Sequence, residues 1–235
     1  MIPIRDENPA HRPPVMTVLL LVANVVAFLY EMALPEQALQ AFVMMRGVVP
    51  ARITTEPLFG GDGGTIPALT LLTSMFLHGG FMHLAGNMLY LWVFGNNVED
   101  RTGHVRFLLF YVLSGLAAAG AQIVMSPDSH VPMIGASGAI AGVLGAYMLL
   151  FPHARVLTLV PFFWVGLVHL PAVVVLGLWF LFQILMSWSE QAGTGGVAFF
   201  AHIGGFVAGM LLIWVFLTRH PRQALEMNAE DERHR

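Results

Sequence analysis

The stretch Met133 to Leu150 reads MIGASGAIAGVLGAYMLL, and it decides the fold because it contains no charged residue. A helix that crosses roughly 30 Å of hydrocarbon needs about 20 mostly apolar residues. The length and composition of this stretch therefore predict a membrane span. Its small residues, four glycines among them, also predict that other helices approach it closely.

The composition of the whole chain agrees with a membrane protein. Of its 235 residues, 57% are hydrophobic and 11% are charged, whereas a soluble domain usually has about 25% charged residues. The same values exclude intrinsic disorder, and the absence of cysteine excludes a disulfide scaffold. A net charge of -3 without a basic run excludes a nucleic-acid partner. The expected surroundings are a lipid bilayer.

Six apolar runs predict an all-α polytopic membrane protein with six transmembrane helices. The runs are Val15 to Leu34, Phe81 to Phe94, Phe107 to Val124, Met133 to Leu150, Val165 to Trp188 and Val197 to Leu217. This predicts a tail over 1–14, a membrane domain over 15–218 with a long outer loop over about 35–80, and a second tail over 219–235.

Three segments outside these runs carry further expectations. Gly79-Gly80 is the natural break in the apolar sequence before the second span, so Pro67 to His78 is predicted to be interfacial or re-entrant. Ala154 to Phe163 is expected to lie along the cytoplasmic interface. The charged group Glu99, Asp100, Arg101 and Arg106 is expected to form an ion-pair network or a helix end.

The arginines predict the orientation of the chain. With six spans, nine of the eleven arginines fall on one side of the membrane, and only Arg46 and Arg52 fall on the other. Arginine is enriched in short cytoplasmic loops. Both termini are therefore predicted to be cytoplasmic, and two short basic tails without a transit sequence favour a bacterial-type plasma (inner) membrane.

Four polar side chains inside the spans predict a functional site, because such residues are costly in a membrane. They are His83 and Asn87 in the second run, Ser137 in the fourth and His202 in the sixth. If the fourth and sixth spans enter from outside at their first residues, Ser137 and His202 lie roughly 6 and 8 Å below the outer surface. His83 and Asn87 share a helix face in the same outer third.

This set of groups is typical of acyl transfer by a serine nucleophile. A neutral histidine can take the proton of Ser137, and His83, Asn87 and the Ser137 backbone N–H can stabilise an oxyanion. The spans that carry these residues contain no carboxylate, which favours a Ser-His dyad and leaves Asp128 as a weak candidate to orient the histidine. His78 and His83 are five residues apart and no HExxH is present, so no metal site is expected.

Glycines accompany both halves of the dyad. Gly135, Gly138 and Gly142 surround Ser137, and Gly205 and Gly209 follow His202. Small residues populate most membrane helix interfaces, so these glycines alone indicate packing. Together with a serine and a histidine at one depth, they predict that the two helices approach closely enough for short side chains to touch.

In order and spacing, these residues resemble the rhomboid intramembrane serine proteases. The resemblance rests on His83-Leu84-Ala85-Gly86-Asn87, on Gly135-Ala136-Ser137-Gly138, and on Ala201-His202-Ile203-Gly204-Gly205 with Gly209. It implies a six-helix rhomboid-like bundle, Ser137 as nucleophile, His202 as general base and acid, and His83 with Asn87 as oxyanion stabilisers. It further implies no metal or cofactor, and substrates that are single-span membrane proteins.

The resemblance raises two points about the surroundings of the site. The fifth span and the loop Ser189 to Gly196 occupy the position of the gate and cap proposed for rhomboids. Some rhomboids stack a tyrosine on the catalytic histidine, but the matching position here is Ala141, so Tyr147 and Phe206 are the available aromatic residues.

Two other functions are compatible with parts of the sequence. A catalytically silent rhomboid-like protein would use the same grooves to hold membrane clients, although such relatives generally lack the serine or the histidine. A small transporter would need a polar path through the whole bilayer, whereas the polar groups here gather near one face.

Overall fold

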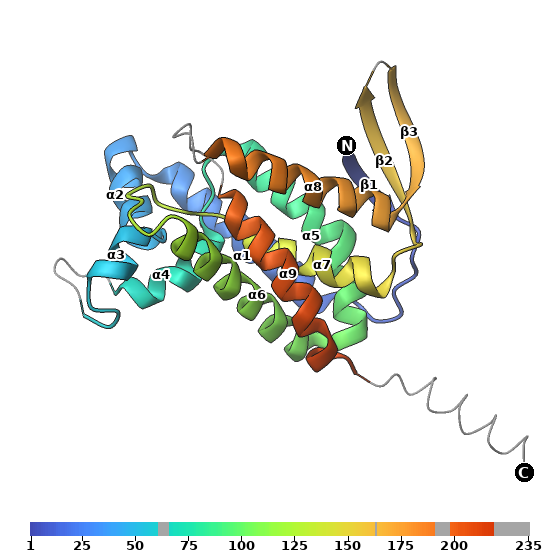
Figure 1. The fold of residues 1–235 in the computed structure, drawn as a ribbon, viewed down its shortest axis with the longest axis horizontal. Coiled ribbons are helices and arrows are strands. Elements are labelled where there is room, and N and C mark those ends of the chain that lie inside the picture. Colours follow the sequence, from blue (N-terminus) through green and yellow to red (C-terminus); the bar gives the residue numbers. More distant parts are fainter. Residues whose placement is uncertain (61–65, 163, 191–197, 219–235) are drawn as a thin grey trace, which may run out of the picture.

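The computed structural model describes residues 1–60, 66–162, 164–190 and 198–218. Helices packed side by side form its main body, and a small sheet lies at one end (Figure 1). The helices are α1 (Val15–Ala33), α2 (Glu36–Arg46), α3 (Pro50–Thr55), α4 (Pro67–Thr73), a short 3-10 helix η1 (Ser74–Phe76), α5 (Phe81–Thr102), α6 (His104–Met125), α7 (Ser137–Leu150), α8 (Ala172–Glu190) and α9 (Phe199–Phe216). The strands are β1 (Ile2–Asp6), β2 (Arg155–Phe162) and β3 (Trp164–Pro171).

Helices occupy the places of all six predicted spans, which agrees with an all-α polytopic membrane protein. In the described part of the chain, α1, α6 and α9 are long and apolar enough to cross a membrane. The pair formed by Pro67–Phe76 and α5 also qualifies if it is taken as one bent span. The helix α7 and the segment Ala172–Ser187 of α8 are shorter apolar helices.

The chain bends where the double glycine predicted a break. The axes of Pro67–Phe76 and α5 differ by 82°, and Gly80 between them has a φ of 150° that favours glycine. A break in a membrane helix leaves backbone groups that need partners. The buried Glu31 carboxylate of α1 supplies one, because it accepts a hydrogen bond from the His78 N–H at 3.1 Å.

The fourth span begins later than the sequence analysis placed it. The helix α7 starts at Ser137, and Met133 instead pairs with Val48 in a β-bridge. Gly135 has a φ of 124°, which an α-helix cannot contain. The predicted start at Met133 is therefore wrong, and Ser137 lies at the N-terminus of the helix instead of one turn inside it.

The predicted start of the fifth span at Val165 is also wrong, because residues 164–171 form β3. This strand pairs along its whole length with β2. The residues of β2 are those that the sequence analysis expected to lie along the cytoplasmic interface. The sequence is rich in valine and leucine, which suit a strand as well as a membrane helix. Pro171 favours an extended residue before it, so the helix begins only at Ala172.

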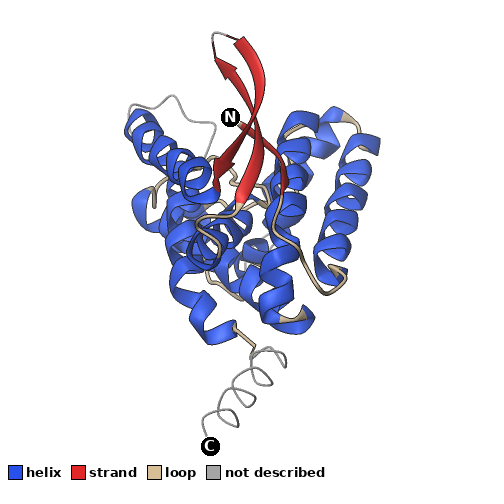
Figure 2. Ribbon diagram, turned by 90° about the vertical axis from the view of Figure 1, so that its right-hand side faces the viewer, coloured by secondary structure: helices blue, strands red, loops and turns tan. Residues whose placement is uncertain are grey.

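The strand β1 completes a three-stranded antiparallel sheet in the order β1-β2-β3, and Figure 2 shows the sheet reaching past the ends of the helices. Residues 2–6 of the predicted N-terminal tail are thus an ordered strand. Its last residue, Asp6, accepts a hydrogen bond from the Tyr147 hydroxyl of α7 at 2.8 Å. Burial raises the pKa of Asp6, and this hydrogen bond partly opposes the rise. The predicted tail over 219–235 lies outside the described residues.

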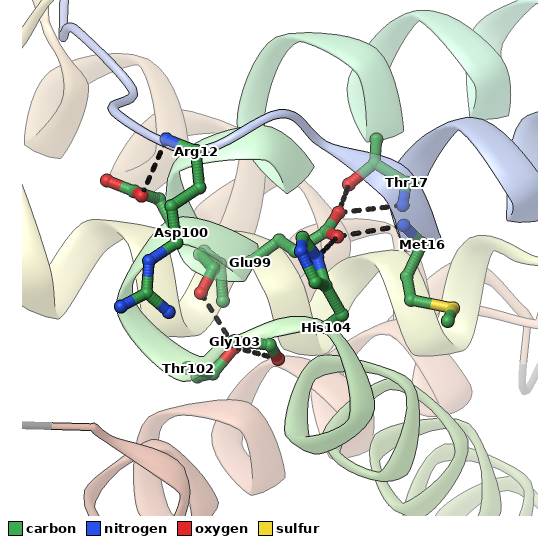
Figure 3. Close-up of polar contacts among 9 residues, drawn as sticks. Arg12, Met16, Thr17, Glu99, Asp100, Thr102, Gly103 and His104 are labelled. Atoms are coloured by element: carbon green, nitrogen blue, oxygen red, sulfur yellow. Dashed lines mark hydrogen bonds and ion pairs between the residues drawn. The ribbon is translucent and has the colours of Figure 1, made fainter.

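Glu99, near the end of α5, caps the N-terminus of α1, and the adjacent Asp100 accepts a hydrogen bond from the backbone N–H of Arg12 before that helix (Figure 3). The residue before α1 is Pro14, whose side chain makes no capping hydrogen bond. Glu99 instead accepts hydrogen bonds from the backbone N–H groups of Met16 and Thr17, both at 2.8 Å, and also contacts the ring of His104. A carboxylate is favoured there because the N-terminus of a helix has free N–H donors and a positive partial charge. Of the two expected roles for this charged group, a helix end is the one that Glu99 has.

Replacing Glu99 with glutamine is expected to lower the free energy of unfolding by about 3 kcal/mol, because an amide group would face donors that are buried at this position. Glu99 is 1% exposed. The measurement is reversible unfolding in detergent micelles. The control is Glu56→Gln, which breaks a half-exposed pair with Arg52 at 3.7 Å and should change stability by less than about 1 kcal/mol. Equal losses in the two variants would contradict the capping role.

Candidate active site

Ser137 and His202 face each other across the contact between α7 and α9. Ser137 is the first residue of α7, and His202 lies in the first turn of α9. The Ser137 Oγ and the His202 Nε2 are 2.8 Å apart, which is a hydrogen-bond distance. The structure thus brings together the two side chains that the sequence analysis paired.

The second ring nitrogen of His202 also has a partner. Its Nδ1 lies 2.8 Å from the Oε1 of Gln183 on α8. The ring of Trp179, one turn earlier on α8, lies beside the imidazole with ring centroids 5.8 Å apart. Gln183 therefore contacts the His202 ring at its Nδ1 edge, and Trp179 packs beside the ring.

His83 and Asn87 line the same site from α5. The Gly79 N–H donates a hydrogen bond to the Nδ1 of His83 at 3.3 Å. The Cε1 and Nε2 edge of the ring packs against Gly135, where an added Cβ would lie 2.9 Å from Nε2 and 3.6 Å from the Ser137 Oγ. Asn87 is 8% exposed, and its Nδ2 has no hydrogen-bond partner among the described residues.

A cavity of about 530 Å³ joins these four side chains. Ligand pockets in proteins commonly have volumes of about 300 to 1,000 Å³. Ser137, His202, His83 and Asn87 all line it. Its remaining wall is largely apolar, with small residues from α6 and larger ones from α5 and from the segments before α5 and α7. These include Ala118, Ala119, Met82, Met75 and Ile134. The arrangement places a hydroxyl, two imidazoles and the unpartnered Asn87 amide donor around one cavity.

The glycines allow the backbones of α7 and α9 to touch. A Cβ added at Gly205 would lie 2.1 Å from the carbonyl oxygen of Gly138, and one at Gly209 would lie 2.0 Å from that of Gly142. Such distances leave no room for any side chain at these positions. The close approach is what lets the short Ser137 side chain reach His202.

Two contributors to the site were not found as such from the sequence. Gln183 was assigned only to interhelical hydrogen bonding, and Trp179 was not singled out. A single amide or aromatic residue in an apolar run gives no signal about which side chain of another helix it contacts. The N-terminus of α9 is held as well, because the Oε1 of Gln122 on α6 accepts a hydrogen bond from the Ala201 N–H at 3.1 Å.

The structure also corrects three expectations about what supports His202. The Nδ1 position that Asp128 would have to occupy is taken by Gln183, so the expectation for Asp128 is wrong. Tyr147 donates its hydroxyl to Asp6, and Phe206 stacks on Phe180 with ring centroids 4.4 Å apart. The aromatic residues beside His202 are Trp179 and Phe199. The expected cap, Ser189 to Gly196, falls mainly on residues 191–197, which lie outside the described residues.

Comparison with known proteins finds relatives along most of the chain. It is 31% identical over 153 residues to Rhomboid protein 1, mitochondrial, of Saccharomyces cerevisiae, which covers 62% of this chain and 41% of the yeast protein. It is 49% identical over 78 residues to the Rhomboid protease GluP of Bacillus subtilis, which covers 33% of this chain and 15% of GluP. With RHOMBOID-like protein 5 of Arabidopsis thaliana, the identity is 28% over 238 residues, covering 90% of this chain and 73% of the relative.

The family model described as the Rhomboid domain matches residues 67–219. The matched region includes the bent entry to α5 and every helix that contributes to the cavity. The multi-pass helical fold and these matches lead to one conclusion: this chain belongs to the rhomboid family of intramembrane proteases.

Proposed function

We propose that this chain is an intramembrane serine endopeptidase that uses Ser137 as nucleophile and His202 as general base. The observation that carries the proposal is the 2.8 Å distance between the Ser137 Oγ and the His202 Nε2 inside a cavity. A serine hydroxyl is a weak nucleophile until an adjacent base takes its proton. The contact has the geometry that this transfer requires.

The reaction follows from the positions of these atoms. The Ser137 Oγ attacks the carbonyl carbon of the scissile peptide bond while its proton passes to the His202 Nε2. The same nitrogen returns the proton to the leaving amine, and the acyl-enzyme forms. A water molecule then attacks the ester carbonyl and gives its proton to the His202 Nε2. As the ester C–O bond breaks, His202 passes that proton to the Ser137 Oγ, and the carboxylic acid product leaves.

His83 and Asn87 are proposed to stabilise the oxyanion. Because the Gly79 N–H donates to the Nδ1 of His83, a neutral ring carries its proton on Nε2. That nitrogen is the one at the Gly135 and Ser137 side of the ring. The Asn87 Nδ2 is a second donor, and its lack of a partner among the described residues leaves it free to meet a developing charge.

The proposed substrates are single-span membrane proteins cut near the outer face of a plasma (inner) membrane. Ser137 and His202 both lie in the first turn of helices that are predicted to start on the outer side. The arginines on the opposite side support cytoplasmic termini. A peptide must leave its helical conformation to enter the cavity, so a helix-destabilised segment near the outer face fits best.

Replacing Ser137 with alanine is expected to abolish both labelling by a fluorophosphonate and cleavage of a transmembrane substrate in proteoliposomes. Loss of the nucleophile in serine hydrolases lowers kcat by about 10⁴-fold or more. The control is Ser187→Ala, because Ser187 lies on α8 outside the cavity lining and donates its hydroxyl to the Ile184 carbonyl. Cleavage retained by Ser137→Ala would refute the proposal, and a wild-type chain that binds clients without labelling would support a silent relative.

A further inference from the structure

We infer that Gln183 is a positioning residue that fixes the tautomer of His202, so that the catalytic unit is a Ser-His-Gln set spread over three helices. The inference rests on the proposed function of Ser137 and His202. It starts from the two hydrogen bonds that the Gln183 amide makes. Gln183 is 5% exposed, and it comes from α8 rather than from the helices that carry the dyad.

The orientation of the Gln183 amide follows from its other partner. The Nε2 of Gln183 donates to the backbone carbonyl of Trp179 at 3.3 Å. A carbonyl oxygen can only accept, so the NH₂ group must face Trp179 and the Oε1 must face His202. A flipped amide would place two oxygen atoms against each other at that site.

The tautomer of His202 follows in turn. Because the Gln183 Oε1 can only accept, the Nδ1 of His202, 2.8 Å away, must carry the proton. A neutral imidazole then has its lone pair on Nε2, the nitrogen 2.8 Å from the Ser137 Oγ. The Trp179 carbonyl thus fixes the orientation of the Gln183 amide, and the amide fixes the tautomer of His202. In that tautomer the His202 Nε2 can accept the proton of Ser137.

Gln183 acts through His202 and not on the substrate. It is absent from the residues that line the cavity, whereas His202 and Trp179 both line it. The stacking of Phe180 on Phe206, with ring centroids 4.4 Å apart, holds this part of α8 against α9. The position of α8 therefore determines whether the base is oriented.

Few other side chains are close enough to influence the ionisation of His202. In the described structure, the titratable side chains that share its cavity are His83 and Tyr90 of α5. The ring of His83 has its centroid 5.2 Å from that of His78. The side chains that meet the His202 ring in the described structure are otherwise Ser137, Gln183, Trp179 and Phe199. None of these four carries a charge near neutral pH, so a charge introduced at position 183 should dominate.

Two substitutions at Gln183 test the inference. Gln183→Leu keeps the approximate volume but removes the acceptor, and it should lower kcat about 10- to 100-fold with little change in KM. Gln183→Glu restores an acceptor with a negative charge that favours the imidazolium ion. It should recover activity at alkaline pH and move the acid limb of the kcat/KM profile upward by about one pH unit or more.

The measurements are pH profiles of substrate cleavage in proteoliposomes, with Ser137→Ala and Phe182→Leu alongside. Phe182 is the neighbouring residue on α8, and its side chain is exposed, so its variant should behave as wild type. A merely structural role would lower activity in both Gln183 variants without moving the acid limb. That result, or wild-type kcat in Gln183→Leu, would overturn the inference while the proposed function stands. Cleavage by Ser137→Ala would instead overturn the proposed function.

Discussion

Alanine at position 135 is expected to lower kcat/KM for substrate cleavage by about 100-fold or more while the helical bundle stays folded. A Cβ at this position would lie 2.8 Å from the Cε1 and 2.9 Å from the Nε2 of His83. Real Cβ atoms do not approach ring atoms so closely, so the His83 ring must move away. Loss of one oxyanion donor costs about 10²- to 10³-fold in serine hydrolases.

The backbone adds to this effect. The φ of Gly135 is 124°, which costs a residue with a side chain of the order of 1 to 3 kcal/mol. The Gly135 N–H also donates to the Ser74 carbonyl at 2.9 Å, so strain here is passed to the segment before α5. Ser137 follows two residues later, and its approach to His202 would change with it.

The matched control is Gly120→Ala on α6, where an added Cβ meets nothing within 4 Å. This variant should keep wild-type activity and gain up to about 1 kcal/mol in helix propensity. Cleavage assays in proteoliposomes and thermal unfolding in detergent separate activity from folding. If Gly135→Ala cleaved substrate at the wild-type rate, His83 could not be the donor that the proposal requires.

Valine at position 209 is expected to destabilise the whole bundle by about 3 kcal/mol or more. An added Cβ there would lie 2.0 Å from the carbonyl oxygen of Gly142 and 2.5 Å from its Cα. These atoms belong to the backbone of α7, so no rotamer change can relieve the overlap. Overpacking of a well-packed core costs about 1 to 3 kcal/mol, and helix separation adds lost contacts.

The same substitution should remove activity in any molecules that still fold. Separating α7 from α9 lengthens the contact between Ser137 and His202, because each helix carries one member of the dyad. Unfolding in detergent and fluorophosphonate labelling report the two effects. Gly177→Ala on α8, where an added Cβ meets nothing within 4 Å, is the control and should lower neither stability nor labelling. A stable, fully labelled Gly209→Val protein would show that the helices do not pack as described.

Most of the membrane helices could be predicted from the sequence, because a long apolar run forms few stable structures other than a membrane-spanning helix. The run Val15 to Leu34 became α1 almost residue for residue. The sheet was missed because valine-rich sequence suits a strand and a membrane helix equally. The strands β2 and β3 pair with each other, and β2 also pairs with Ile2–Asp6, a partner about 150 residues distant in sequence.

The residues of the site could likewise be predicted only in part. Ser137, His202, His83 and Asn87 could be selected because each is a costly group inside an apolar run, and the structure gathers all four around one cavity. Gln183 was equally costly, yet its partner depends on the rotation of α8 about its axis. That rotation is set by packing such as the contact of Phe180 with Phe206, which a sequence pattern does not encode.

The pairing of β1 with β2 also sets an order of events while the chain is being made. Asp6 and its partner Tyr147 are separated by 141 residues, and β2 follows Tyr147 in the chain. At a synthesis rate of about 5 to 20 residues per second, β1 waits on the order of 10 to 30 s for its neighbours to emerge. During that time α1 can enter the bilayer, but the sheet edge that precedes it has nothing to pair with. Closure of the sheet is therefore a late step, taken after the helix that carries Ser137 has been synthesised.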